Sequence, residues 1–167
     1  MKKLISIIMI ATLCCAFTAC KNDSGDSGKN NSSNKSNSST VSNKKPSEKA
    51  NELLSSVTFP EMVSKDMEFV EVTLGITSDM VSEHVFYICG SGAMPDEFGI
   101  FAATSAENAS QIKDKLGSRV EYQRDTYSTY SPDEAYKLTD CFVDIVNGNT
   151  VIYAVCADNS KAREILK

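Results

Sequence analysis

The sequence has little that could hold a metal or carry redox chemistry. His84 is the only histidine among the 167 residues, so a zinc site would need cysteines or carboxylates at ligand spacing, and no such spacing is present. The Cys-x-x-Cys pair that redox enzymes use is absent as well. We therefore expect no metal and no cofactor. We interpret His84, at the start of a predicted strand, as a structural or exposed residue.

The apolar segment at the N-terminus is too short to stay in a membrane as a helix. It covers residues 4–17, which is 14 residues, whereas a spanning helix needs about 20. Two lysines precede it, and the small residues Thr18 and Ala19 follow it. This is the order of an export signal, so we predict that residues 1–19 are a signal peptide that is removed.

The residue after this segment is Cys20, and its surroundings resemble the lipobox of bacterial lipoproteins. In that pattern the cysteine receives a diacylglyceryl group and becomes the new N-terminus. Cys14 and Cys15 fit less well, because Leu13 and a second cysteine precede them. Acyl chains such as palmitate add about 0.8 kcal/mol per buried methylene, so two or three chains hold where one would not. We expect lipidation at Cys20 and a location at the outer face of the cell membrane; the alternative is an ordinary secretory signal with an incidental cysteine.

The segment after Cys20 lacks apolar residues. Residues 21–47 include nine Ser, six Asn and five Lys, with Val41 as the single aliphatic side chain. Such a segment cannot bury enough surface to offset chain entropy, so we predict that residues 20–47 are the lipidated cysteine and a disordered linker.

The remaining residues, 48–167, are acidic and long enough for one domain with a single core. They carry 10 Lys and Arg against 20 Asp and Glu, whereas the linker has an excess of three positive charges. An acidic surface argues against nucleic acid as a partner, and a basic linker suits an anionic membrane surface. The alternative is that both charges serve only solubility.

The first half of this domain predicts a helix, an ambiguous segment and a hairpin. Apolar positions fall on one face of a helix over 47–57, capped by Ser47. We interpret residues 66–74 as extended or as an edge strand. Residues 84–89 and 98–104 are rich in β-branched and aromatic side chains, which predicts a pair of strands.

The second half predicts a long helix, a short helix, a second hairpin and a last helix. Thr104 has capping-box spacing before a helix with apolar residues every three or four positions. A short helix follows Ser131 and reaches Leu138, and strands over 141–146 and 150–157 flank a turn. Asp158 or Asn159 caps the last helix. The fold class is therefore α+β, with an antiparallel sheet of about four strands, in two hairpins, packed with one face on helices.

Four motifs of the domain occur together in a pattern of their own. They are YICGSGAMPDEFGIF (87–101), Arg119-x-x-x-Gln123, Tyr130-x-Pro132-x-Glu134, and Gly148 before a strand rich in Val and Ile. These motifs resemble those of an uncharacterised lipoprotein family of Gram-positive anaerobes, domain of unknown function 4358. The resemblance implies an exported, lipid-anchored α+β domain with no assigned activity, over nearly all of residues 48–167.

The candidate binding residues lie on the first hairpin loop and the long helix. Asp96 and Glu97 are neighbours, so on a strand they point to opposite faces and do not form a catalytic acid and base pair. One of them could pair with Arg119, or bind a ligand. Arg119 and Gln123 are one helical turn apart and could together grip a carboxylate or amide.

Tyrosines cluster around the break after the long helix, and Tyr130 is our fourth binding candidate, after Glu97, Arg119 and Gln123. Such side chains can form a rigid recognition surface, suited to sugars of a cell wall. The alternative is that two or three of them fill the joint between the helices. The four tyrosines are Tyr122, Tyr127, Tyr130 and Tyr136.

Three cysteines, Cys89, Cys141 and Cys156, remain in the domain. If the second hairpin turns at Gly148-Asn149, Cys141 faces Cys156 and a cross-strand disulfide can form. A turn one residue earlier places the two diagonally and too far apart. The alternative, which we favour, is three buried thiols that act as small apolar residues.

Together these features favour a lipid-anchored extracytoplasmic binding or interaction module over an enzyme. Its membrane partner is reached through the lipid, and its ligand or protein partner belongs to the envelope. Two other functions stay open: a cell-envelope hydrolase that uses the loop carboxylates, and a structural envelope lipoprotein that pairs with another protein at the sheet edge.

Overall fold

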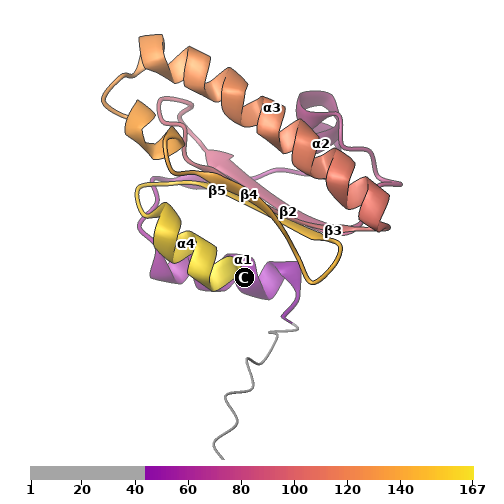
Figure 1. The fold of residues 1–167 in the computed structure, drawn as a ribbon. Helices are drawn as coiled ribbons and strands as arrows, with labels where there is room; N and C mark the ends of the chain where they lie inside the picture. Colours follow the sequence, from indigo (N-terminus) through magenta and orange to yellow (C-terminus); the bar gives the residue numbers. More distant parts are fainter. Residues whose placement is uncertain (1–43) are drawn as a thin grey trace, which may run out of the picture. The chain divides into compact units, whose positions relative to one another are not determined.

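A computed structural model describes residues 44–167, shown in colour in Figure 1. The predicted signal peptide, Cys20 and most of the predicted linker lie outside the described residues. The first helix begins at Pro46, two residues before the boundary that composition indicates.

The described part of the chain contains one antiparallel sheet of five strands in the order β1-β2-β3-β5-β4. Both predicted hairpins are present, β2 with β3 and β4 with β5, and they join because β3 also pairs with β5. The fifth strand, which the sequence did not indicate, is the three-residue β1 at one edge. The bounds are β1 (Met62–Ser64), β2 (Val81–Cys89), β3 (Glu97–Ala103), β4 (Phe142–Val146) and β5 (Thr150–Val155).

Four α-helices of residues 44–167 cover both faces of the sheet, whereas we expected one covered face. Figure 1 shows α2 and α3 on one side and α1 and α4 on the other. A single 3-10 turn, η1 (Ala135–Leu138), takes the place of the short helix. The helices are α1 (Pro46–Ser56), α2 (Met67–Leu74), α3 (Ala106–Tyr130) and α4 (Asn159–Leu166).

Side chains alternate along the strands to form two cores. On β3, Phe101 faces the core under α2 and α3, whereas Phe98 and Ile100 face the core over α1 and α4. On β5, Tyr153 faces the core under α2 and α3, and Ile152 faces the core over α1 and α4. All five are fully buried, and each such burial contributes about 1.5–3 kcal/mol for an aliphatic or phenyl side chain.

The expectation that residues 66–74 are extended is wrong, because this segment is helix α2. Asp66 caps the helix by accepting a hydrogen bond from the backbone N of Phe69 at 3.0 Å. Gly75 ends it with φ of 66°, a left-handed conformation that glycine adopts at low cost. Val70 and Leu74, one turn apart, are buried in the same core as the inner face of α3.

Helix α3 begins one residue later than the sequence indicates. Ser105, rather than Thr104, is the cap, and its hydroxyl accepts from the backbone N of Asn108 at 3.0 Å. Thr104 instead donates its hydroxyl to the carbonyl of Asp79 at 3.0 Å. The predicted face is confirmed at Ala109, Ile112, Leu116, Val120 and Gln123, which are buried, whereas its last member, Tyr127, is only partly buried.

The second hairpin turns through three residues, 147–149, so its register is neither of the two we considered. Phe142 pairs with Ala154, and Ile145 pairs with Val151. This register sends Cys141 to the core under α3 and Cys156 to the core over α4. The two thiols are therefore free, and the possible disulfide between them is not formed.

Two glycines give opposite predictions for stability. A Cβ on Gly99 would lie 2.5 Å from Cε2 of Phe101, so Gly99→Ala must displace a buried ring and should lower the free energy of unfolding by about 1–3 kcal/mol. A Cβ on Gly117, within α3, would lie in open space. Gly117→Ala should therefore raise the free energy of unfolding by up to about 1 kcal/mol. Urea unfolding curves of both variants measure this. Equal effects of the two would contradict the packing around Phe101.

Candidate functional site

The centre of the domain is an ion pair between Glu97, at the start of β3, and Arg119, in the middle of α3. Nε and Nη2 of Arg119 donate to the two carboxylate oxygens of Glu97 at 3.1 and 2.9 Å. The Glu97 side chain is 2% exposed and that of Arg119 is 21% exposed. This forked geometry fixes the guanidinium in one orientation.

A tyrosine and a glutamine complete the surroundings of Glu97. The hydroxyl of Tyr153, on β5, lies 2.6 Å from Oε1 of Glu97 and 3.0 Å from Oε1 of Gln123. Burial, and then the charge of Glu97, hold the pKa of Tyr153 well above its usual range, so its hydroxyl stays protonated and donates to the carboxylate. Gln123 in turn donates to the carbonyl of Pro95 at 3.4 Å.

Three of the four predicted binding residues thus come together, but as an internal network. Arg119 grips the carboxylate of Glu97, and Gln123 is buried behind them. Tyr130 is separate: its side chain is 69% exposed and contacts the edge of the Tyr127 ring at 6.2 Å between centroids. Sequence spacing placed Arg119 and Gln123 on one face; nothing in it indicated Tyr153.

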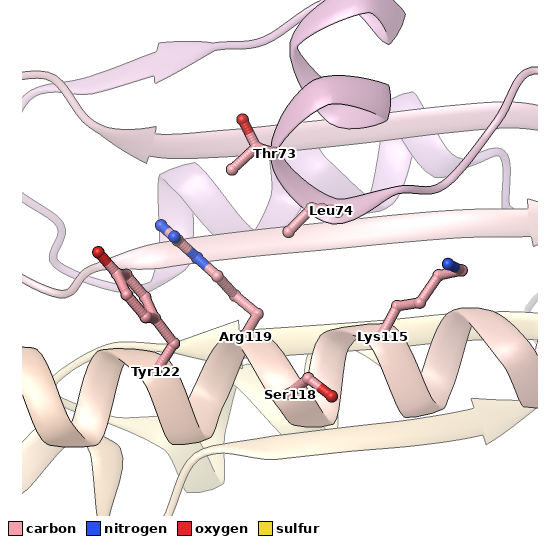
Figure 2. Close-up of a pocket in the computed structure, with 6 residues that line it drawn as sticks. All are labelled: Thr73, Leu74, Lys115, Ser118, Arg119 and Tyr122. Atoms are coloured by element: carbon pink, nitrogen blue, oxygen red, sulfur yellow. The ribbon is translucent and has the colours of Figure 1, made fainter.

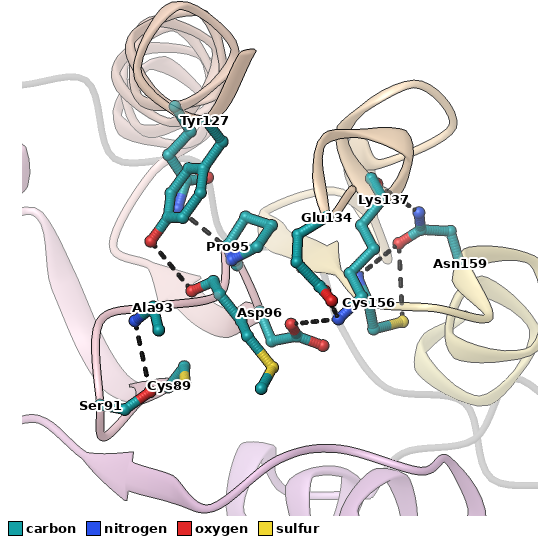
Figure 3. A network of polar contacts seen from close by, with 12 residues as sticks. Cys89, Ser91, Ala93, Pro95, Asp96, Tyr127, Glu134, Lys137, Cys156 and Asn159 are labelled. Carbon is teal, nitrogen blue, oxygen red and sulfur yellow. Dashed lines mark hydrogen bonds and ion pairs between the residues drawn. The ribbon is translucent and has the colours of Figure 1, made fainter. Parts of the chain in front are cut away.

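Tyr127 fills the joint between α3 and the loop that joins β2 to β3. Its hydroxyl lies 3.0 Å from the carbonyl oxygen of Gly92 and 2.9 Å from that of Met94. The other three tyrosines of the cluster are exposed. Tyr127 therefore ties this loop to the helix, and Figure 3 shows it above the loop.

A second buried ion pair involves Asp96, the residue before Glu97, and is shown in Figure 3. Lys137, on η1, contacts Oδ2 of Asp96 at 2.7 Å and Oε2 of Glu134 at 2.6 Å. Asp96 and Glu97 are neighbours but have different partners, as their alternation along an extended chain predicts. Burial raises the pKa of Asp96 above its usual value, and its Oδ1 has no hydrogen-bond partner within residues 44–167.

Asn159 extends this second network to α4 and β5. Its amide Nδ2 donates to the carbonyl of Lys137 at 2.8 Å, and its Oδ1 accepts from the backbone N of Cys156 at 3.0 Å. Burial lowers the pKa of Lys137, but its contacts with the carboxylates of Asp96 and Glu134 outweigh this, so the pKa lies above its usual value. Lys137 therefore stays charged and holds η1 against the sheet.

A pocket of about 460 Å³ lies between α2 and α3, and Arg119 is part of its wall (Figure 2). Figure 2 shows the Arg119 side chain reaching from α3 between Tyr122 and Thr73, with Lys115 at the other end of the pocket. None of the lining residues is acidic, although the domain carries an excess of ten negative charges. The lining residues are Thr73, Leu74, Lys115, Ser118, Arg119 and Tyr122.

The sequence did not indicate this pocket, for one reason on α3 and another on α2. Lys115 lies one turn before Arg119 on the same helix, and Tyr122 follows three residues later, so the helical spacing alone could have grouped them. Thr73 and Leu74 could not have been found, because we interpreted their segment as extended.

Other candidates for chemistry have structural roles. The ring of His84 stacks on Phe101 with 6.3 Å between centroids, and burial lowers its pKa. Burial raises the pKa of the Cys156 thiol to about 11 and also raises that of Cys141, so neither favours a nucleophilic thiolate. Residues 44–167 contain no cluster of three or more metal-ligating side chains, and no helix there is long and apolar enough to cross a membrane.

A family model, described as a domain of unknown function (DUF4358), matches residues 55–156. The match runs from the end of α1 to the residue after β5 and includes both ion pairs and the pocket. This confirms the domain inferred from the motifs. No curated protein matches the chain, and no solved structure does.

Glu97→Gln tests whether the ion pair serves stability. The amide leaves Arg119 without a charged partner, so we expect a loss of about 2–3 kcal/mol in the free energy of unfolding, less than for a fully buried pair because Arg119 is partly exposed. Glu83→Gln, on the exposed side of β2, is the matched control and should change it by less than about 0.5 kcal/mol. Urea unfolding measures both. Unchanged stability of Glu97→Gln would mean that Glu97 is kept for a ligand rather than for the fold.

Proposed function

The chain belongs to the family of the domain of unknown function DUF4358, and we propose that it is a lipid-anchored extracytoplasmic binding module. In this proposal Cys20 carries the lipid, the polar segment between Cys20 and α1 is the tether, and the domain presents the pocket between α2 and α3 to a small envelope ligand. The order of lysines, apolar run, small residues and cysteine supports the anchor.

The observation that carries the binding function is the position of Arg119. Its guanidinium is held by two hydrogen bonds to a buried carboxylate and at the same time forms part of the pocket wall. A donor group held in one orientation before a ligand arrives loses little conformational entropy on binding. A surface arginine without such support would not have this property.

A hydrolase that uses the loop carboxylates has less support. Glu97 accepts hydrogen bonds from Arg119 and Tyr153, and Asp96 is paired with Lys137. Both are almost fully buried, and neither lines the pocket. A general acid or base must come within hydrogen-bond reach of the substrate, so these positions favour binding over hydrolysis.

The anchor is tested by Cys20→Ala in the full chain, expressed in a bacterium and grown with labelled palmitate. We expect the unaltered chain to carry label and to sediment with membranes, because two or three acyl chains anchor firmly. Cys20→Ala should lose both properties, while a Cys14→Ala, Cys15→Ala double variant should keep them. Label that persists in Cys20→Ala would overturn the lipid site.

Binding is tested by the thermal stability of a soluble chain that begins at Lys21, against cell-wall fragments, sugars, amino acids and short peptides. A ligand at a hundredfold its dissociation constant adds about 2.7 kcal/mol, which raises Tm by several degrees. We expect at least one class to do so. If none does, the small-ligand function is wrong, and the module would be a structural lipoprotein whose partner is another envelope protein.

A further inference from the structure

The guanidinium of Arg119 has a second hydrogen-bonding edge that Glu97 does not use. An arginine carries five N–H donors arranged along two edges, one formed by Nε with one Nη group and the other by the two Nη groups. Glu97 occupies the edge of Nε and Nη2. The second edge consists of Nη1 and the outer N–H of Nη2. It makes no hydrogen bond to any side chain or backbone group within residues 44–167.

This open edge is the part of Arg119 that can face the pocket. Glu97 is 1% exposed, so the edge bound to it points into the domain. The Arg119 side chain is 21% exposed and the residue lines the pocket beside Tyr122, so we infer that its free edge is the one turned toward the pocket. Its Cζ lies 5.9 Å from the centre of the Tyr122 ring. A planar or tetrahedral oxyanion is the group that such a fork binds with two parallel hydrogen bonds.

The charge of the pocket favours the same kind of ligand. Glu97 neutralises Arg119, and Lys115 adds a positive charge that no carboxylate within 4.0 Å offsets among the described residues. Lys115 also lies close to the end of α2, with Nζ 3.2 Å from where a Cβ of Gly75 would be, which alone would explain it as a partner of the helix C-terminus. The open edge of Arg119 has no such structural explanation.

The rest of the lining is suited to the body of an organic molecule rather than to a bare ion. Leu74 lies between the two cationic side chains in Figure 2, and the Tyr122 ring is 62% exposed at one end. Thr73 offers a hydroxyl group that can donate or accept, and the hydroxyl of Ser118, which donates to the carbonyl of Asp114 at 3.1 Å, can still accept. A ligand with a ring or short apolar part could cover Leu74 and Tyr122 while its charged group lies on Arg119.

We propose that this pocket binds a small organic molecule through a carboxylate or phosphate placed on the open edge of Arg119, with Lys115 as the second cation. The inference rests on the proposed binding function and names its ligand class. The charged group is held by the fork, and the ring or apolar part lies against Leu74 and Tyr122.

The test is a titration of the chain from Lys21, labelled with ¹⁵N, with benzoate, phenyl phosphate and the neutral analogue benzamide at one ionic strength. Benzamide matches benzoate in shape but lacks its charge. We expect saturable shifts of backbone signals at Thr73, Ser118 and Tyr122 and of the Nε–H signal of Arg119 with benzoate or phenyl phosphate. The tighter of these two probes tells whether the site prefers carboxylate or phosphate. Benzamide should bind at least about tenfold more weakly, since charged partners roughly double hydrogen-bond strength.

Two lysine variants control for general electrostatics. Lys115→Ala should weaken binding of the charged probe about three- to fivefold, the range for one partly screened charge. Lys113→Ala, two residues away on the exposed side of α3, should leave it unchanged. The ¹⁵N spectrum of each variant also shows that it is folded. Equal effects of the two variants would overturn the oxyanion site.

The outcomes separate this inference from the broader function. If benzamide binds at the same residues as tightly as benzoate, the pocket is a ligand site but not one for oxyanions, and the inference fails while the binding function stands. If shifts appear only around α4, where Arg163 lies, the site is wrongly placed. If no probe, charged or neutral, shifts the pocket residues, both proposals are overturned for this pocket.

Discussion

The ion pair between Glu97 and Arg119 is the constraint on which the arrangement of the domain depends. A carboxylate as buried as that of Glu97 is costly unless it is paired and its oxygens accept hydrogen bonds. Arg119 supplies two donors from α3, and Tyr153 supplies one from β5. The pair therefore fixes the position of α3 along its axis, and its rotation about that axis, relative to β3 and β5.

The neighbouring residue, Asp96, is also a buried carboxylate with a charged partner, on the other side of the strand. Its partner Lys137 holds η1, and Asn159 connects that turn to α4. Two adjacent carboxylates at the start of β3 thus connect elements that are otherwise far apart in the chain. Burial is the main reason that the pKa of Asp96 is raised, and the second carboxylate near the same ammonium, that of Glu134, adds to it.

Arg119 also connects the fold to the proposed function, because one side chain serves both. Its inner edge satisfies a buried carboxylate, and the residue also lines the pocket between α2 and α3. The same contacts that stabilise the helix on the sheet hold the guanidinium ready for a ligand. In this domain the stability of the core and the geometry of the pocket cannot be varied independently at that residue.

The sequence by itself determined the features that depend on neighbouring residues. Both hairpins follow from strand-forming runs beside turn residues, and the buried face of α3 follows from a 3.6-residue repeat. Helix α2 was missed because its cap and its terminal glycine outweigh an ambiguous apolar pattern, and the β4–β5 register depended on a turn one residue longer than either alternative. Only the tertiary structure decided which donors surround Glu97 and where the pocket lies. Tyr153 is 56 residues from Glu97 in the chain, and no local preference reports a contact that exists only after the strands pair and α3 packs over them.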